Sequence, residues 1–106
     1  MWIRSALWEG SINPGKENEF KTKINEDFLP QIKAMPGVKD VKALWPRVYE
    51  DRSKELFCQI IVEFEGEKDI QTMLASPQRH ATRARLSELG HLYQGKISHI
   101  NYEVYK

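Results

Sequence analysis

The sequence predicts an α+β fold in which four strands and two helical regions follow one another in the order β-α-β-β-α-β. Three observations lead to this prediction. Residues 56–65 alternate as a strand does, two segments carry apolar residues at helical spacing, and Pro and Gly clusters separate the segments. With 106 residues, 41% of them hydrophobic, the chain is predicted to form one domain, residues 1–106, around a single core.

The clearest strand pattern lies between residues 56 and 65, a segment rich in β-branched and aromatic residues. Alternate side chains of a strand point to opposite faces, and here one set is apolar while the other is mixed. We therefore expect helices to cover one face of the sheet and the other face to need only partial cover. The apolar set is Leu56, Cys58, Ile60, Val62 and Phe64, and the mixed set is Phe57, Gln59, Ile61, Glu63 and Glu65.

The first strand is predicted at residues 2–9, followed by a turn that ends in a helix start, with Asn13 as N-cap and Pro14 at the first helical position. An apolar residue at every fourth position gives this helix a stripe for packing on the sheet. Pro30 lacks a backbone N–H, so we expect a kink or break near Leu29. The stripe is Phe20, Ile24, Phe28 and Ile32, and the pairs Glu17–Lys21 and Glu19–Lys23 have the spacing of ion pairs on the solvent side.

The second half of the chain is predicted to contain a strand at 38–49, a short helix at 67–74, a longer helix from Ser76-Pro77 to Gly95, and a last strand at 96–106. Pro46 lacks a ladder donor and indicates an edge strand or a bulge. The polar segment 50–55 is expected to be a solvated loop. The inward stripe of the longer helix is Thr82, Leu86, Leu89 and Tyr93, while His80 and His91 are expected on its exposed side.

This order of elements is the ferredoxin-like arrangement, a four-stranded antiparallel sheet covered by helices on one face. Right-handed crossovers place both helical regions on the same face of the sheet. The uncovered face then carries large apolar residues such as Phe57 and Ile61. A bare apolar sheet face favours pairing with a second copy, so we expect a homodimer.

Composition and charge favour a soluble cytoplasmic protein. The net charge of +1 offers no general attraction for nucleic acid or acidic lipid, and no apolar run is long enough to span a bilayer. The N-terminus lacks the features of a secretory signal. The single cysteine, Cys58, cannot form an internal disulfide and is expected to be an inert core residue. The histidines His80, His91 and His99 lack metal-ligand spacing, so no metal site is predicted.

Besides the order of elements, three segments of the sequence are informative: Met35-Pro36-Gly37-Val38, the strand end Ile-Val-Glu-Phe-Glu at 61–65, and residues 73–79. They resemble the dimeric α+β barrel superfamily, and within it the chain is most similar to the EthD-like proteins, which are associated with ether and aromatic-compound breakdown. The resemblance implies two sheets packed back to back as a barrel, with a pocket in each subunit between sheet and helices. Many EthD-like proteins have a histidine in the first helix, where this chain reads Asn25-Glu26-Asp27-Phe28.

Six residues are candidates for the site. His99 is the one histidine expected on a strand, and a neutral imidazole there suits proton transfer near pH 7. The alternative for His99 is a histidine that lines the barrel and bonds to a neighbouring strand. Arg79 and Arg85 flank the inward stripe of the longer helix, and a guanidinium suits a carboxylate, phenolate or enolate. The aromatic wall of the pocket is predicted from Trp8, Trp45 and Tyr49.

We therefore expect a homodimer that binds a small, largely apolar, oxygenated molecule in each subunit, without a cofactor. The first hypothesis is an enzyme, because the resemblance implies relatives that are cofactor-independent monooxygenases, decarboxylases, dehydratases or isomerases. The second is a non-catalytic binding or accessory protein of a degradation pathway, which the missing histidine of the first helix favours. The third is a nucleic-acid-binding domain, but the exposed aromatic motif of RNA-binding ferredoxin-like modules is absent.

Overall fold

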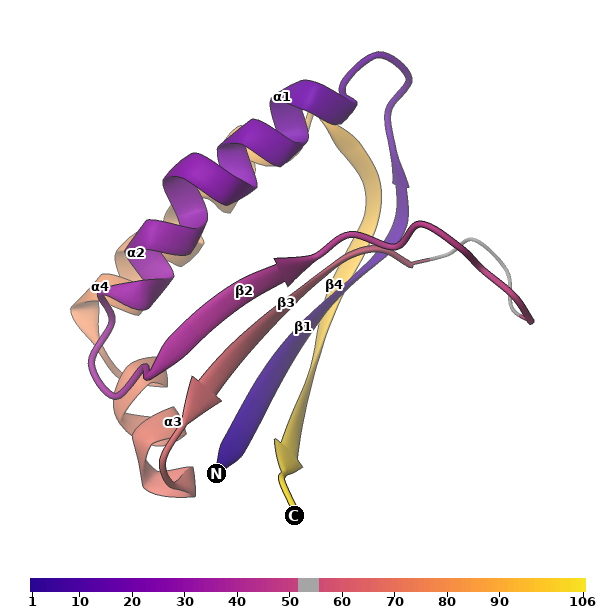
Figure 1. Ribbon diagram of the computed structural model, residues 1–106. Coiled ribbons are helices and arrows are strands. Elements are labelled where there is room, and N and C mark those ends of the chain that lie inside the picture. Colours follow the sequence, from indigo (N-terminus) through magenta and orange to yellow (C-terminus); the bar gives the residue numbers. More distant parts are fainter. Residues whose placement is uncertain (52–55) are drawn as a thin grey trace.

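The computed structural model describes residues 1–51 and 56–106 and contains a four-stranded antiparallel sheet in the order β2-β3-β1-β4 (Figure 1). Strands β3 and β1 therefore occupy the centre of the sheet, and β2 and β4 form its edges. The elements are β1 (Trp2–Ile12), α1 (Glu17–Thr22), the π-helical η1 (Lys23–Phe28), α2 (Leu29–Lys33), β2 (Asp40–Leu44), β3 (Leu56–Phe64), α3 (Glu67–Leu74), α4 (Pro77–Ala84), the 3₁₀ helix η2 (Arg85–Leu89) and β4 (Tyr93–Glu103).

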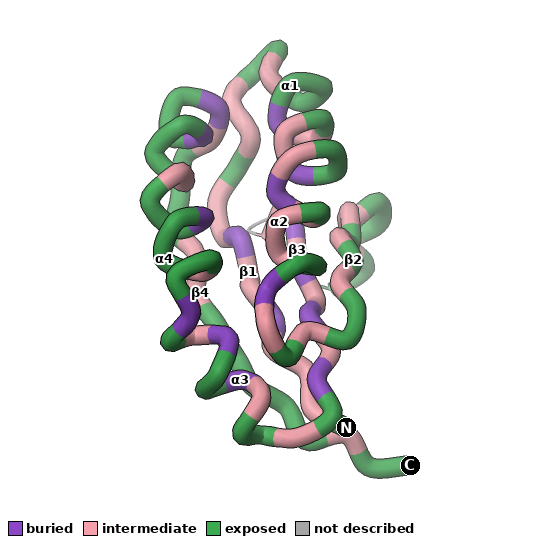
Figure 2. The backbone as a smooth tube through the Cα atoms, turned by 90° about the vertical axis from the view of Figure 1, so that its left-hand side faces the viewer, coloured by how far each residue is buried: buried purple, intermediate pink, exposed green. Residues whose placement is uncertain are grey.

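The predicted ferredoxin-like βαββαβ fold is confirmed. All helices lie on one face of the sheet, with α1–η1–α2 over one half and α4–η2 over the other (Figures 1 and 2). The core fills the space between helices and sheet, where the buried side chains of both layers meet. None of the helices in the two described ranges is long and apolar enough to cross a membrane. The buried core comprises Trp8, Phe20, Ile24, Phe28, Met35, Cys58, Ile60, Val62, Phe64, Ile70, Met73, Leu89 and Leu92.

Strand β3 follows the predicted alternation except at its first residues. Cys58, Ile60, Val62 and Phe64 are buried under the helices as expected. The register against β1 shifts between Trp8 and Glu9, so that Trp8 pairs with Cys58 and Glu9 with Leu56. The extra residue of this bulge, Phe57, packs with the core, and the prediction that placed it on the uncovered face is wrong. A bulge inserts an extra residue and so changes which face of the sheet a nearby side chain points to. The alternation of residue types along the sequence does not reveal where a bulge lies.

Two glycines, one just after the predicted first strand and one at the predicted end of the longer helix, lie inside the sheet. Gly10 and Gly95 pair directly across β1 and β4, with φ angles of 130° and 144°. A Cβ on Gly95 would lie 1.8 Å from the carbonyl oxygen of Glu9, so no larger residue fits. The strands therefore continue past both glycines. As a result β1 is longer than predicted at its end, and β4 starts earlier than predicted.

The first helical region begins later than predicted. Pro14 and Gly15 form a turn, Lys16 N–H donates to Asn13 O over 3.0 Å, and the helix starts at Glu17. The predicted apolar stripe is confirmed, with Phe20, Ile24 and Phe28 buried and Ile32 half-buried. The expected irregularity near Leu29 takes the form of a π turn, in which Leu29 N–H donates to Ile24 O. The chain then remains helical through Pro30, which sits in the first turn of α2.

The second helical region begins as predicted and ends earlier. Ser76 is the N-cap of α4, where its Oγ accepts a hydrogen bond from Arg79 N–H. After Ala84 the backbone tightens into η2 and ends at Leu89. Thr82 and Leu89 are buried, as the inward stripe requires, and His80 and His91 are exposed. Tyr93, predicted as the last member of that stripe, belongs to β4 instead.

Candidate functional site

A cavity of about 120 Å³ lies between the sheet and the two helical regions. Its walls come from every layer of the subunit, because β1, β3 and β4 form the floor and the two helical regions form the sides. Most of the lining is apolar, and the polar members are few. The apolar lining consists of Ala6, Trp8, Ile24, Phe28, Ile32, Met35, Ile60, Val62, Met73, Leu86 and Ile97, and the polar lining of Arg4, Arg79, Thr82, Arg83 and His99.

The polar lining of the cavity includes three arginines, which we call the arginine cluster: Arg4 on β1, and Arg79 and Arg83 on α4. Arg4 is half-buried, and its Nη1 donates to Oδ1 of Asn101 on β4 over 3.0 Å. Burial, followed by the charges of Arg79 and Arg83, lowers the pKa of Arg4. Burial and then Arg83 likewise lower the pKa of Arg79. The three guanidiniums are therefore close enough to repel one another.

His99 lies on the helix-facing side of β4, opposite Ala6 in the register. It lines the cavity from an edge strand, where the residue remains solvent-accessible. Partial desolvation, and then the charges of Arg4, Arg83 and Arg79, lower the pKa of His99 to about 4. The imidazole is therefore neutral near pH 7, with one nitrogen able to accept a proton.

Trp8 joins the cavity to an aromatic cluster at one end of the sheet. Its ring packs edge-on against Phe20 at 5.4 Å and Tyr93 at 5.3 Å between centroids, and Phe57 completes the group. Only 2% of Trp8 is exposed. Its buried Nε1–H has no hydrogen-bond partner within the described part of the chain. Buried donors are normally paired, so this indole N–H is available to an acceptor.

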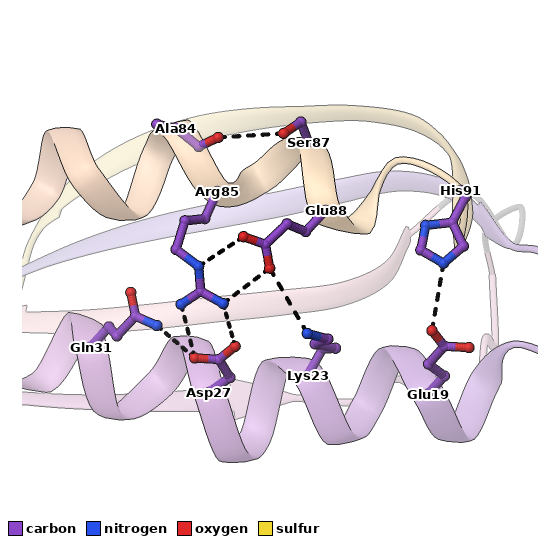
Figure 3. Close-up of polar contacts among 9 residues, drawn as sticks. All are labelled: Glu19, Lys23, Asp27, Gln31, Ala84, Arg85, Ser87, Glu88 and His91. Atoms are coloured by element: carbon purple, nitrogen blue, oxygen red, sulfur yellow. Dashed lines mark hydrogen bonds and ion pairs between the residues drawn. The ribbon is translucent and has the colours of Figure 1, made fainter.

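Four polar pairs join the two helical regions, and we call this set the seam; Figure 3 shows all of them except the Gln31–Thr82 pair. Its members recur every four residues on the first helical region and every three on the second, so each turn of one helix meets the other. The predicted pair Glu19–Lys23 does not form, because both side chains reach across to the other helical region instead. The pairs are Glu19–His91, Lys23–Glu88, Asp27–Arg85 and Gln31–Thr82.

Arg85 is the centre of the seam. Its Nη1 and Nη2 donate to the two carboxylate oxygens of Asp27 over 3.0 and 2.6 Å, and its Nε donates to Glu88 Oε2 over 3.0 Å. Hydrogen bonds from Arg85 lower the pKa of Asp27 and that of Glu88, and the two carboxylates raise the pKa of Arg85. Its guanidinium also lies 5.2 Å from the ring of Phe28. Each of the three guanidinium nitrogens of Arg85 thus donates to a carboxylate within the chain.

The structure brings three of the six predicted site residues together at the cavity: Trp8, Arg79 and His99. It does not bring Arg85 there, because that side chain is held in the seam. Trp45 lies outside the cavity lining, beside Phe20 and 5.5 Å from Lys21 Nζ. The Tyr49 hydroxyl donates to the Leu56 carbonyl, which ties the loop after β2 to the start of β3.

Sequence reasoning missed Arg4 and Arg83. A signal for Arg4 was present, because it shares a strand face with Trp2, Ala6 and Trp8, and a charge among such neighbours is unusual on a covered face. Arg83 is not part of the predicted inward stripe of the longer helix, nor among the arginines expected to flank it. In the structure Arg83 is an exposed residue that nevertheless lines the cavity. No group of three metal-ligating side chains occurs among the residues that the structure describes.

The fold and the cavity define a ferredoxin-like subunit with a pocket between sheet and helices. Neither a protein-family model nor a curated protein sequence matches the chain. Among solved structures, an ethyl tert-butyl ether degradation (EthD) family protein from Bacillus halodurans is similar, with a TM-score of 0.77, 15% identity and 99% of both chains covered. The EthD-like resemblance is thereby confirmed at the level of the fold.

Two further solved structures show the same fold. A protein from Arabidopsis thaliana is similar with a TM-score of 0.78 and 12% identity, covering 100% of this chain and 97% of that one. A dimeric protein of unknown function with a ferredoxin-like fold from Bacteroides fragilis has a TM-score of 0.61 and 14% identity, with 97% and 96% of the two chains covered. Identities this low support the fold and not an activity.

Proposed function

We propose that this protein is a homodimer that binds a small, partly apolar, oxygenated molecule in the cavity of each subunit. One observation supports the proposal above all: an apolar cavity with several polar groups on its wall, namely the arginine cluster and His99. Small-molecule sites combine such apolar walls with a few convergent polar groups. A pocket formed only by imperfect packing has no reason to gather charged side chains from two elements.

The convergence of a base with fixed positive charges favours the enzyme hypothesis over simple binding. In this hypothesis, the neutral imidazole of His99 removes a proton from a carbon next to a carbonyl group. An arginine of the cluster then stabilises the negative charge that develops on the carbonyl oxygen. An imidazole with a pKa of about 4 is a weak base, but the developing oxyanion offsets the arginine charges that lower this pKa. The reaction needs no cofactor.

The test uses ethyl benzoylacetate, a neutral aromatic β-keto ester of suitable size. Proton NMR in D₂O measures how fast the hydrogens between its two carbonyl groups exchange with solvent. We expect the protein to accelerate this exchange and His99→Gln to lose about 10²–10⁴-fold of the acceleration, the usual share of a general base. His80→Gln, on the exposed side of α4, is the matched control and should retain the full rate.

A non-catalytic ligand-binding or accessory role is the second candidate, and the absence of a histidine between residues 25 and 28 supports it. Under this alternative, ethyl benzoylacetate shifts the NMR signals of cavity residues while its hydrogens exchange at the uncatalysed rate. An exchange rate that does not depend on His99 would therefore reject the enzyme hypothesis and retain the binding proposal.

The homodimer proposal is supported by the uncovered face of the sheet. Ile61 pairs beside Ser5, and Ser5 pairs beside Ile100, so these residues share that face. Ile100 is 42% exposed and Tyr102 43%, an unusual degree for large apolar side chains in a sheet. The Bacteroides fragilis protein of the same fold is described as dimeric.

Light scattering at micromolar concentration tests the assembly. We expect the mass of a dimer, with an interface that buries more than about 1,200 Å² in total. Ile100→Glu, which places a charge on the uncovered face, should give the monomer mass. Val48→Glu is the control, because Val48 is 79% exposed and lies outside the strands. A monomer mass for the unmodified protein would contradict the proposal.

A further inference from the structure

The arginine cluster has no negative partner within the subunit. Within the described ranges, Arg4, Arg79 and Arg83 take part in no ion pair, and the cavity lining contains no Asp or Glu. The side chain of Arg4 has one neutral acceptor, the Asn101 amide oxygen. Three positive charges at one cavity are therefore balanced by nothing that the structure describes.

Holding these charges together costs stability. Each guanidinium at the cavity loses part of its water, and like charges repel one another more strongly where water is partly excluded. The lowered pKa values of Arg4 and Arg79 express both effects. Arg85, only a few residues further along the chain, avoids this cost through two carboxylates. An arrangement that repels itself in the empty state is balanced when an anion enters.

The polar lining that the structure describes is richer in donors than in acceptors. Guanidinium groups are donors without acceptor capacity, and the buried Trp8 Nε1–H is a donor without a partner in the described residues. The Thr82 hydroxyl donates to Gln31 Oε1 over 3.0 Å. Among the described lining side chains, the neutral His99 imidazole and the Thr82 hydroxyl oxygen are able to accept, and neither carries a negative charge. A ligand that satisfies this cavity must consist mainly of acceptors at one end and apolar surface at the other.

We propose that the cavity recognises an aromatic or alicyclic carboxylate, with the carboxylate held by Arg4, Arg79 and Arg83 and the ring held by the apolar walls. A carboxylate fits because its two oxygens match the paired donors of a guanidinium, which gives short, charge-assisted hydrogen bonds. The ring occupies the space between Phe28, Leu86 and Trp8, where burial of apolar surface contributes to binding. This inference rests on the proposed function, since it names the class of molecule that the same site takes.

Three probes of nearly identical shape test the inference: benzoate, benzamide and benzamidine, which carry charges of −1, 0 and +1 at pH 7. Isothermal titration calorimetry measures their affinities at low ionic strength. We expect benzoate to bind at least about ten-fold more tightly than benzamide, the ratio that one charge-assisted hydrogen bond provides. Benzamidine should bind more weakly than either. The indole N–H signal of Trp8, followed by NMR, should shift on addition of benzoate.

Arg83→Gln and Arg79→Gln remove one charge each while keeping much of the apolar stem. Each should lower the affinity for benzoate about ten-fold and leave that for benzamide almost unchanged. Arg47→Gln is the matched control, because Arg47 is exposed and does not line the cavity. Equal affinities for benzoate and benzamide would overturn the carboxylate inference while leaving the proposed function standing. If benzoate, benzamide and ethyl benzoylacetate all fail to bind, both proposals are wrong.

Discussion

The arginines of the seam and of the cavity lie in two contrasting environments a short distance apart. Arg85 in the seam donates to two carboxylates, which raise its pKa, and it holds the two helical regions together. Arg4 and Arg79 at the cavity have no carboxylate partner among the described residues, and burial and like charge lower their pKa values. Residue type and position on the same helical region are thus insufficient to assign a role. The presence or absence of a partner separates an arginine that stabilises the fold from one that is available to a ligand.

The largest expected effect is on the free energy of unfolding, and it comes from a core residue of the helical region that contributes to both the seam and the arginine cluster. Leu89 is fully buried in η2, between the seam and the sheet, and Leu89→Ala should lower the free energy of unfolding by about 2–5 kcal/mol. His80→Ala, on the exposed side of α4, should change it by less than ~0.5 kcal/mol. Urea denaturation measures both. Comparable losses for the two variants would show that the helical layer is turned the other way.

The next prediction concerns the denaturation midpoint, which should respond differently when a charge is removed from the seam and when one is removed from the arginine cluster. Asp27→Asn removes the charge that Arg85 pairs with, so it should lower the denaturation midpoint, though by less than Leu89→Ala does. Arg83→Gln removes a charge that only repels its neighbours, so it should leave the midpoint unchanged or raise it. Thermal or urea melts at low salt give both values. A lower midpoint for Arg83→Gln would mean that the arginine cluster is structural.

The smallest expected effect is a change in the pH dependence of stability. The pKa of His99 is about 4 in the folded protein, against an ordinary value of 6.5, owing to desolvation and the charges of Arg4, Arg83 and Arg79. The unfolded chain therefore binds more protons between these values, so stability is complete above pH 6.5 and declines as the pH falls toward 4.

His99→Gln should flatten the stability curve within that window and leave it unaltered above. His80→Gln serves as the control on α4. The carboxylates of Asp27 and Glu88, whose pKa values are lowered chiefly by Arg85, act in the same direction but at lower pH. An unchanged slope in the His99→Gln variant would show that the arginine cluster does not affect this histidine. It would also remove the electrostatic basis of the proposed carboxylate site.

Local patterns of residues determined most of the fold. The alternation in β3 from Cys58 onward, the stripe of Phe20, Ile24 and Phe28, and the cap at Ser76 each depend on neighbours within a few residues, and all three are confirmed. The order of these elements is sufficient for the ferredoxin-like topology, since right-handed crossovers leave few alternatives. Sequence reasoning also selected Trp8, Arg79 and His99, which line the cavity.

Two other departures from regular periodicity, both in the sheet, were decided only by the tertiary structure. Glycine usually weakens or interrupts a strand. Gly10 and Gly95 nevertheless lie opposite each other within the sheet, where no side chain would fit between the strands. The bulge that turns Phe57 into the core exists only in the pairing of β3 with β1.

The tertiary structure also decided which arginines have a carboxylate partner. The sequence contains enough carboxylates to pair with every arginine, and spacing along one helix cannot tell which arginine obtains a partner from another element. Asp27 meets Arg85 because two helices pack side by side, whereas no carboxylate of the described residues belongs to the cavity lining that includes Arg4 and Arg83. Local sequence thus determines periodicity, and long-range packing determines the electrostatic environment of each charge, because Coulomb energy depends on distance in space and not along the chain.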